Sequence, residues 1–177
     1  MKDGTADSII NAASELFSEL GVWGTSLGDI AKAVGISKGT LYYHYPAKQD
    51  IVEIVSTRCI SDIGDRILGW IDGISGDSEP RRALSELCEA LLGEAGLRLF
   101  ISIYNAAEPE GDMEASIDRA MSEWNVMLDV GALRMRAGAA AKMKRIAPAI
   151  IPFLCGLAAL NADMDYAKAA FTAFVLG

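Results

Sequence analysis

Apolar residues recur along this chain at intervals of three and four positions, which is the spacing of one face of an α-helix. The first twenty residues already show this pattern, because Ile9, Ala13, Phe17 and Leu20 would line one side of a helix. Gly21 follows where such a helix would end. Runs of alternating apolar and polar residues, which indicate strands, are nearly absent. The pattern therefore predicts an all-α protein.

Cap and turn residues predict two short helices after the first one. Ser26 and Asp29 have the spacing of a capping box, in which two side chains near the start of a helix bond to its free backbone N–H groups. Gly35 stands where this helix would end, so we expect a helix over 27–34. A third helix is expected over 38–44.

The rest of the chain predicts a long fourth helix and five more. Pro46 is expected in the first turn of the fourth helix, where its missing N–H costs nothing, and the apolar stripe continues to Ile74. About nine helices result, as a small N-terminal unit of three helices and a larger C-terminal bundle. The last five predicted helices cover 81–94, 97–107, 112–136, 142–160 and 163–176.

Composition and charge exclude several classes of protein. The chain has 177 residues, of which 51% are hydrophobic, so it can form a core and is not a disordered chain. Its net charge of −8 argues against a protein that coats nucleic acid by bulk charge. No apolar stretch reaches the ~20 residues that a membrane helix needs, and the first residues contain no apolar signal segment. We therefore expect no membrane association and a cytoplasmic location.

The chain offers few groups for catalysis or metal binding. Cys59, Cys88 and Cys155 are far apart in sequence and form no CxxC pair, so each is interpreted as a small core residue. His44 is the single histidine, which excludes a His-rich zinc site and argues against a Ser-His-Asp triad. There is also no phosphate-binding loop and no nucleophile beside a base. We expect no enzyme, no metal site and no cofactor.

Residues 27–44 have the pattern of a helix-turn-helix. Ala31 is small where the two helices would approach closely, Gly35 permits the sharp turn, and Leu41 would point from the second helix toward the first. Such units place their second helix in the major groove of DNA. The residues of the second helix left for its outer face and edges can reach bases or phosphates: Lys38, Gly39, Thr40, Tyr42, Tyr43 and His44.

Three more residues are candidates for phosphate contacts. Thr25 and Ser26 open the helix over 27–34, and the N-terminal amides of a helix favour a phosphate. Lys48, at the start of the fourth helix, would add a further contact to the DNA backbone.

The stretch from Thr25 to Lys48, which reads TSLGDIAKAVGISKGTLYYHYPAK, resembles the DNA-binding domain of the TetR family of regulators. The match covers about residues 6–55. The resemblance implies an all-α homodimer with a helix-turn-helix DNA-binding domain over 1–46. It also implies a ligand-binding and dimerisation domain over 47–177, joined to the first by the fourth helix and dimerising through the last two helices.

The resemblance also implies a role for each matching residue. Thr25 and Ser26 would contact phosphate, and Lys48 would touch the DNA backbone. Lys38, Gly39 and Thr40 would face bases, while Tyr42, Tyr43 and His44 would straddle base edges and phosphates. The chain departs from the family where members often carry Arg or Lys before the first helix, since it reads Thr-Ala-Asp-Ser there. Residues 1–50 hold four lysines and six acidic residues, a net charge of −2, which predicts few phosphate contacts and a shallow salt dependence of about −0.9 per contact.

Two sets of residues in the C-terminal half have two interpretations each. The first set can line an apolar ligand pocket or form ordinary bundle core, and consists of Trp70, Phe100, Tyr104, Asn105, Met121, Trp124 and Met127. The second set can form a four-helix interface between two subunits or lie buried within one chain, and consists of Ile146, Ile150, Phe153, Leu154, Leu157, Phe171 and Phe174.

The expected function is that of a ligand-responsive transcriptional regulator. It would bind a near-palindromic, double-stranded DNA operator as a homodimer and would be released by a small apolar or amphipathic effector, which the sequence does not identify. That it represses rather than activates is implied by the resemblance alone. The acidic N-terminal balance favours one alternative, an apolar-ligand carrier or protein-interaction bundle with little DNA affinity.

Overall fold

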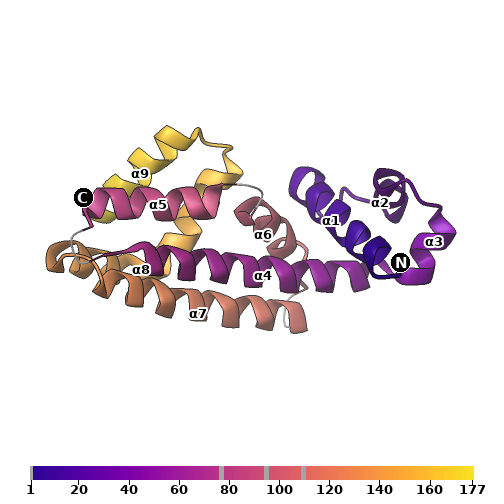
Figure 1. The fold of residues 1–177 in the computed structure, drawn as a ribbon, viewed down its shortest axis with the longest axis horizontal. Coiled ribbons are helices and arrows are strands. Elements are labelled where there is room, and N and C mark those ends of the chain that lie inside the picture. The colour runs from indigo at the N-terminus through magenta and orange to yellow at the C-terminus, as the bar shows by residue number, and fades with distance from the viewer. Residues whose placement is uncertain (1, 76–77, 94–95, 109–110) are drawn as a thin grey trace. The chain divides into compact units, whose positions relative to one another are not determined.

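The computed structural model describes residues 2–75, 78–93, 96–108 and 111–177 (Figure 1). Within these ranges the chain forms nine helices and no strand, which confirms the predicted all-α class. The helices are α1 (Lys2–Leu20), α2 (Leu27–Val34), α3 (Lys38–His44), α4 (Lys48–Gly73), α5 (Pro80–Leu92), α6 (Gly96–Tyr104), α7 (Asp112–Leu133), α8 (Ala137–Ala159) and α9 (Met164–Leu176).

The bounds of α2 and α3 agree with the prediction, and α5, α6 and α9 begin within one residue of it. Helices α6 and α7 end three residues earlier than predicted, at Tyr104 and Leu133, and α4 and α8 begin elsewhere. The expectation that Pro46 lies in the first turn of α4 is wrong, because the backbone N–H of Ala47 donates to the Asp50 carboxylate at 2.9 Å and the helix begins at Lys48. Helix α8 begins at Ala137, five residues before its predicted start, in an alanine-rich stretch without apolar periodicity. Alanine has the highest helix propensity, which extends the helix there. The predicted end of the fifth helix, at 94, lies outside the described residues.

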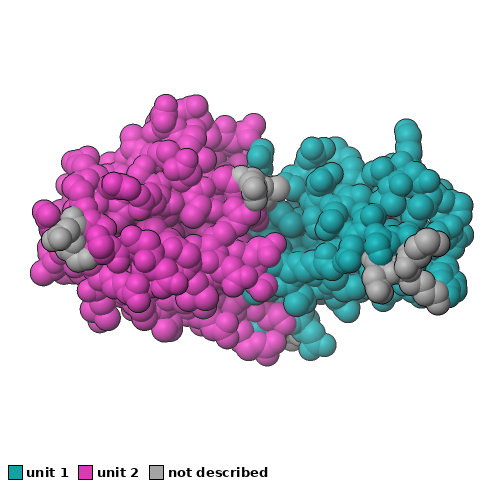
Figure 2. All heavy atoms as spheres, viewed as in Figure 1, with its two compact units in different colours: residues 1–60, 98–115 teal, residues 61–97, 116–177 magenta. Residues whose placement is uncertain are grey.

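The chain divides into two compact units (Figure 2). Unit 1 comprises residues 1–60 and 98–115, and unit 2 comprises 61–97 and 116–177. The sequence predicts a boundary between residues 46 and 47 that separates a DNA-binding domain from a ligand-binding domain. This boundary is defined by function and not by compactness, so it stays a prediction.

The core of unit 1 lies beneath the first three helices. Ile9, Ala13 and Phe17, which the spacing placed on one face of α1, are fully buried, whereas Leu20 at the end of the same stripe is 56% exposed. Ile30 of α2 and Leu41 of α3 are also fully buried. Each short helix is therefore held in place mainly by one large apolar side chain. Full burial of such a side chain contributes about 1.5–3 kcal/mol. This small core fixes the angle at which α3 is presented.

The core of unit 2 is formed by apolar stripes of several helices. Ile63 and Ile67 of α4, Leu84 of α5 and Trp124 of α7 are among its largest fully buried side chains. Trp70 is buried in the same unit, and its indole N–H donates to the Ala83 carbonyl at 2.7 Å. No helix in the described part of the chain is long and apolar enough to cross a membrane.

Candidate nucleic-acid interface

Helix α2 begins with a complete capping box. The Ser26 hydroxyl accepts from the Asp29 N–H at 3.2 Å, and the Asp29 carboxylate accepts from the Ser26 N–H at 2.9 Å. The helix ends at Gly35, whose φ of 75° lies in the left-handed region that glycine adopts without strain. The chain can then turn sharply into α3, as the sequence pattern predicts.

Helix α3 exposes nearly all of its surface. The Ser37 hydroxyl caps it by accepting from the Thr40 N–H at 3.0 Å. Leu41 is its buried residue, while Tyr42 and Tyr43 are 49% and 69% exposed. Lys38, Gly39 and Thr40 are also exposed, and His44 is half-buried. Six of the predicted DNA-binding residues therefore lie on one outward-facing helix.

The side chain of Lys38 crosses from α3 to the start of α2. A Cβ built on Gly28 would lie 3.0 Å from its Cε and 3.2 Å from its Nζ, so the glycine makes room for the lysine. The pKa of the nearby Asp29 carboxyl is held below its ordinary value, mainly by the hydrogen bond from the Ser26 hydroxyl, with a smaller effect of Lys32 and Lys38. The exposed end of this unit thus carries a carboxylate as well as cations.

The surroundings of Thr25 argue against its predicted phosphate contact, which stays a prediction. This residue is 2% exposed, and its hydroxyl donates to the carbonyl oxygens of Gly21 at 2.9 Å and Leu16 at 3.3 Å. Its backbone N–H points to the Val22 carbonyl at 3.4 Å. Both donors are used inside the turn between α1 and α2, so Thr25 has no donor left for DNA.

Ser26 is exposed, yet its hydroxyl has a strong acceptor within the protein. The hydroxyl donates to the Asp29 carboxylate at 2.6 Å. A phosphate approaching the first turn of α2 would meet the negative charge of Asp29, which offsets the attraction of the helix N-terminus. The capping role of Ser26 therefore competes with its predicted contact to phosphate.

Lys48 is turned toward the protein rather than away from it. Its ammonium group donates to the Val22 carbonyl and lies 5.9 Å from the centre of the Phe17 ring. Burial lowers the pKa of this lysine. The arrangement assigns Lys48 to holding α4 against the α1–α2 turn, which is at odds with the predicted contact to the DNA backbone.

A further contact of the same turn cannot be seen in the sequence. The Val22 N–H donates to the Ser102 hydroxyl of α6 at 2.9 Å. Ser102 is eighty positions from Val22 in sequence, and nothing in its local pattern indicates this pairing. Through it, a helix from the second half of the chain becomes part of unit 1.

The predicted pocket residues do not form one group. Trp70 and Trp124 lie in the core of unit 2, which favours the alternative interpretation of these two as ordinary core. Phe100 is buried, Tyr104 and Asn105 are exposed, and all three belong to unit 1. Met121 and Met127 of unit 2 are half-buried. A pocket formed by these seven residues stays a prediction.

The predicted dimer residues divide into two groups. Ile150, Leu154 and Phe171 are fully buried within the chain and Leu157 is 7% exposed, so they leave little surface for a partner subunit. They pack into the chain's own core, which was the alternative. Ile146, Phe153 and Phe174 remain half-buried, and the rings of Phe153 and Phe174 stack with centroids 4.2 Å apart.

The exposed face in the second half of α8 is formed mostly by small residues, and exposed Leu160 follows at its end. The pattern of large side chains did not indicate these positions, although the abundance of alanine and glycine is visible in the sequence. The exposed residues from the middle of α8 to just past its end include Pro148, Ala149, Pro152, Gly156, Ala159 and Leu160.

Comparison with known proteins supports the interpretation of the N-terminal segment. Residues 9–55 match the family described as bacterial regulatory proteins, tetR family. The chain is 35% identical over 112 residues to the HTH-type transcriptional regulator AcrR of Shigella flexneri, covering 62% of this chain and 52% of AcrR. It is 48% identical over 62 residues to IcaR of Staphylococcus aureus strain Newman, the HTH-type negative transcriptional regulator of the biofilm operon icaADBC, covering 35% of this chain and 33% of IcaR. The chain thus spans about half the length of AcrR and a third of IcaR.

The fold extends this similarity beyond the matched segment. The crystal structure of AibR in complex with isovaleryl coenzyme A and operator DNA has a TM-score of 0.71, at 16% identity over 97% of this chain and 98% of AibR. At this identity the match shows a shared fold. The resemblance of residues 25–48 to the TetR family is confirmed by the family match.

Proposed function

We propose that this chain, whose N-terminal domain is that of the TetR family, is a transcriptional regulator that binds operator DNA as a homodimer. The observation that carries the proposal is the exposure of α3. Leu41 is its buried residue, and the polar and aromatic side chains around Leu41 lie at or near the surface. A helix-turn-helix places such a helix in the major groove. AibR, which has the same fold, was crystallised with operator DNA.

The proposed DNA contacts come from the outer face and edges of α3. Lys38, Gly39 and Thr40 lie in its first turn and face the bases. Tyr42, Tyr43 and His44 follow and reach base edges and phosphates. Thr25 and Lys48 are left out, because their donors are used within unit 1. Ser26 acts mainly as the cap of α2.

The proposed dimer forms through α8 and α9. Two such helices from each subunit make a four-helix interface with two-fold symmetry. Small exposed residues on α8 permit close approach of the partner, and half-buried Phe153 and Phe174 add apolar area. The two α3 helices would then lie about 34–36 Å apart, one turn of DNA, or a multiple of it, on a near-palindromic operator.

The proposed regulation is repression that a small effector relieves. IcaR is named as a negative regulator, and AibR was crystallised with isovaleryl coenzyme A. A small apolar or amphipathic effector bound within residues 47–177 would favour a conformation with lower DNA affinity. The difference in effector affinity between the two conformations sets the effect, typically about 1–3 kcal/mol. A protein with this role acts in the bacterial cytoplasm and is not an enzyme.

The test is binding of the full chain to a labelled duplex from upstream of its own gene, measured by fluorescence anisotropy against a shuffled duplex. We expect selective binding that weakens with salt, and a loss of about tenfold or more in Lys38→Gln or Tyr43→Ala, because each contact contributes about 1–3 kcal/mol. The control Arg119→Gln removes an exposed cation of α7, outside the proposed dimer helices.

Two results would overturn the proposal. One is equal affinity for the two duplexes. The other is unchanged DNA binding when Lys38 and Tyr43 are both replaced by alanine, which would favour a ligand carrier or an interaction bundle instead.

A further inference from the structure

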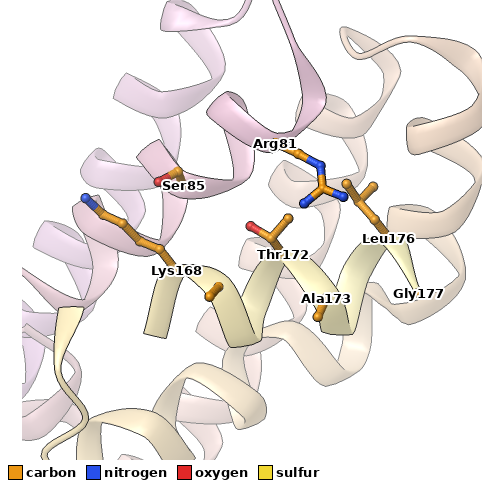
Figure 3. Close-up of a pocket in the computed structure, with 8 residues that line it drawn as sticks. Arg81, Ser85, Lys168, Thr172, Ala173, Leu176 and Gly177 are labelled. Carbon is orange, nitrogen blue, oxygen red and sulfur yellow. The ribbon is translucent and has the colours of Figure 1, made fainter. Parts of the chain in front are cut away.

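A groove on unit 2 lies between α5 and α9, with a volume of about 410 Å³ (Figure 3). This volume is within the range of about 300–1,000 Å³ that small-molecule sites occupy. None of the pocket residues expected from the sequence lines it. The groove is lined by Arg81, Ser85, Lys168, Ala169, Thr172, Ala173, Leu176 and Gly177.

The polar groups of the groove come from two helices that face each other. Arg81 and Ser85 are one turn apart on α5, and Figure 3 shows them across from residues of α9. Lys168, Thr172 and Leu176 follow each other at intervals of four on α9, so their side chains form one stripe along it. Two cations and two hydroxyl groups therefore border the same hollow.

Among these polar groups, the Thr172 hydroxyl has no evident structural role. Thr172 is 7% exposed, and no residue in the described part of the chain hydrogen-bonds with its side chain. A helical threonine commonly bonds to the carbonyl four residues earlier, but this one does not. Thr172 is nevertheless not a buried unsatisfied group, because its oxygen is not among the fully buried side-chain polar atoms that lack a partner in the described ranges. Its place in the lining of the groove makes it available to a ligand.

Arg81 is the second group that lacks a partner. No carboxylate among the described residues pairs with its guanidinium, whereas its neighbour Arg82 pairs with Glu86 at 2.8 Å. The Ser85 hydroxyl likewise has no hydrogen-bond partner in the described ranges. Both side chains line the groove together with Thr172. Three donor groups thus line the same groove without a partner among the described residues.

The charge of the groove selects for an anion. No side chain in its lining is acidic, although the chain as a whole carries a net charge of −8. Lys168 adds positive charge and is held in place by Glu89 at 3.2 Å. The ammonium of Lys142, which does not line the groove, donates to the carbonyl of the lining residue Leu176.

We propose that this groove binds the carboxylate of a small apolar acid. The guanidinium of Arg81 can donate two parallel hydrogen bonds to a carboxylate, a geometry that its planar fork favours. The hydroxyls of Ser85 and Thr172 donate to the remaining lone pairs of the same group. Ala169, Ala173 and Leu176 provide apolar surface for the body of the acid. The inference goes beyond the proposed function, since it assigns a site independent of DNA.

The test uses hexanoate as the probe and the full chain without DNA. Binding is measured by calorimetry, and the site is located from chemical-shift changes of backbone amides in α5 and α9. Hexanamide and hexylamine have the same apolar body without the negative charge, and inorganic phosphate has the charge without the body. We expect hexanoate to bind at least about tenfold more tightly than the other three, because hydrogen bonds to a charged group are the strong ones.

Matched variants connect this binding to the groove. Arg81→Gln should lose about tenfold in hexanoate affinity, and Thr172→Val, which keeps the side-chain shape, about threefold to tenfold. Arg82→Gln, a change of the same kind in the adjacent ion-paired arginine, should bind hexanoate as the wild type does. Unchanged thermal unfolding of Arg81→Gln would show that its loss is not a loss of fold.

Three results would overturn the proposal. The first is hexanamide binding as well as hexanoate. The second is phosphate binding while hexanoate does not. The third is a wild-type dimer that does not bind hexanoate and that Arg81→Gln converts to a monomer. This result would mean that a carboxylate of a second copy occupies the groove. None of these outcomes depends on whether the chain binds DNA.

Discussion

The ammonium group of Lys48, at the start of α4, donates to the carbonyl oxygen of Val22 in the turn between α1 and α2. The same Val22 donates its N–H to Ser102, so both backbone groups of this residue are held by side chains from later helices. Lys48 is therefore a structural residue of unit 1, whereas Lys38, on the exposed helix α3, remains free to meet DNA.

This difference predicts opposite effects for two lysine substitutions. Lys48→Met should lower the free energy of unfolding by about 1 kcal/mol, because one hydrogen bond to a part-buried carbonyl is lost. Lys38→Met should change stability little, because Lys38 contributes only weakly at Asp29. It should lower operator affinity by about tenfold, the effect of one lost base contact. Urea unfolding and DNA titrations at several salt concentrations measure both. A reduced slope of log affinity against log salt in Lys48→Met at unchanged stability would contradict the assignment.

The capping box of α2 predicts a pH dependence of stability. The pKa of Asp29 is lowered from its ordinary value of 3.8, first by the hydrogen bond from the Ser26 hydroxyl and then by that from the Ser26 N–H. A carboxyl with a lowered pKa stabilises the folded state above its unfolded-state pKa, and this contribution is lost as the pH falls through the folded-state value. Wild type should therefore be more stable than Asp29→Asn at pH 7, and the difference should shrink below about pH 4.

Urea unfolding between pH 2.5 and pH 7 measures this difference. Glu19→Gln, which changes an exposed acid of α1, serves as the control and should not reproduce the trend. A stability difference between wild type and Asp29→Asn that is constant over the whole range would contradict the role of the Asp29 charge in the cap.

Gly131 of α7 lies directly against the ring of Trp70. A Cβ at Gly131 would lie 2.2 Å from Cζ3 of that ring. The ring cannot move away easily, because its indole N–H is bonded to Ala83. Gly131→Ala should therefore lower the free energy of unfolding by about 1–3 kcal/mol, the usual cost of overpacking.

The neighbouring Gly69→Ala is the matched control for this substitution. A Cβ at Gly69 would meet no atom within 4 Å, and the residue is in the interior of α4. Its replacement should raise the free energy of unfolding by about 0.5–1 kcal/mol through helix propensity alone. Equal effects of the two substitutions in urea unfolding would show that the contact between Gly131 and Trp70 is not tight.

The proposed dimer predicts a change of oligomeric state for Gly156→Glu. Gly156 is exposed on α8, and a Cβ there would meet no atom of its own chain within 4 Å. A glutamate should thus leave the monomer folded, while two buried like charges would oppose association across a two-fold axis. Sedimentation velocity should show a dimer for wild type and a monomer for the variant. Gly69→Glu, also exposed and open, should remain dimeric, and a dimeric Gly156→Glu would place the interface elsewhere.

The helix-turn-helix could be predicted from the sequence because its signals are local. The caps Ser26 and Ser37 act on backbone groups within three residues, and Gly35 adopts its left-handed conformation within one turn of the chain. These signals need no knowledge of the rest of the molecule. For the same reason the bounds of α2 and α3 were predicted correctly, and the outward position of Tyr43 followed from the inward position of Leu41.

The roles of individual polar side chains could not be predicted in this way. Thr25 and Lys48 have the residue types and positions of phosphate ligands, yet both donate to carbonyl oxygens of their own chain. Ile150 and Leu154 are apolar residues of a helix expected at the dimer surface, yet the fold turns them inward. Periodicity identifies an apolar stripe but does not say whether the chain itself or a partner covers it.

The sequence by itself determined that the chain is all-helical, where most helices lie, and that α3 belongs to a helix-turn-helix, because propensity, capping and periodicity act over a few residues. Only the tertiary structure decided which donors are used internally and which apolar faces are covered. It also brought Arg81 of α5 and Thr172 of α9 to one groove, although about ninety positions separate them in the sequence. Such contacts depend on how whole helices pack, and packing is a property of the complete set of side chains rather than of any local stretch.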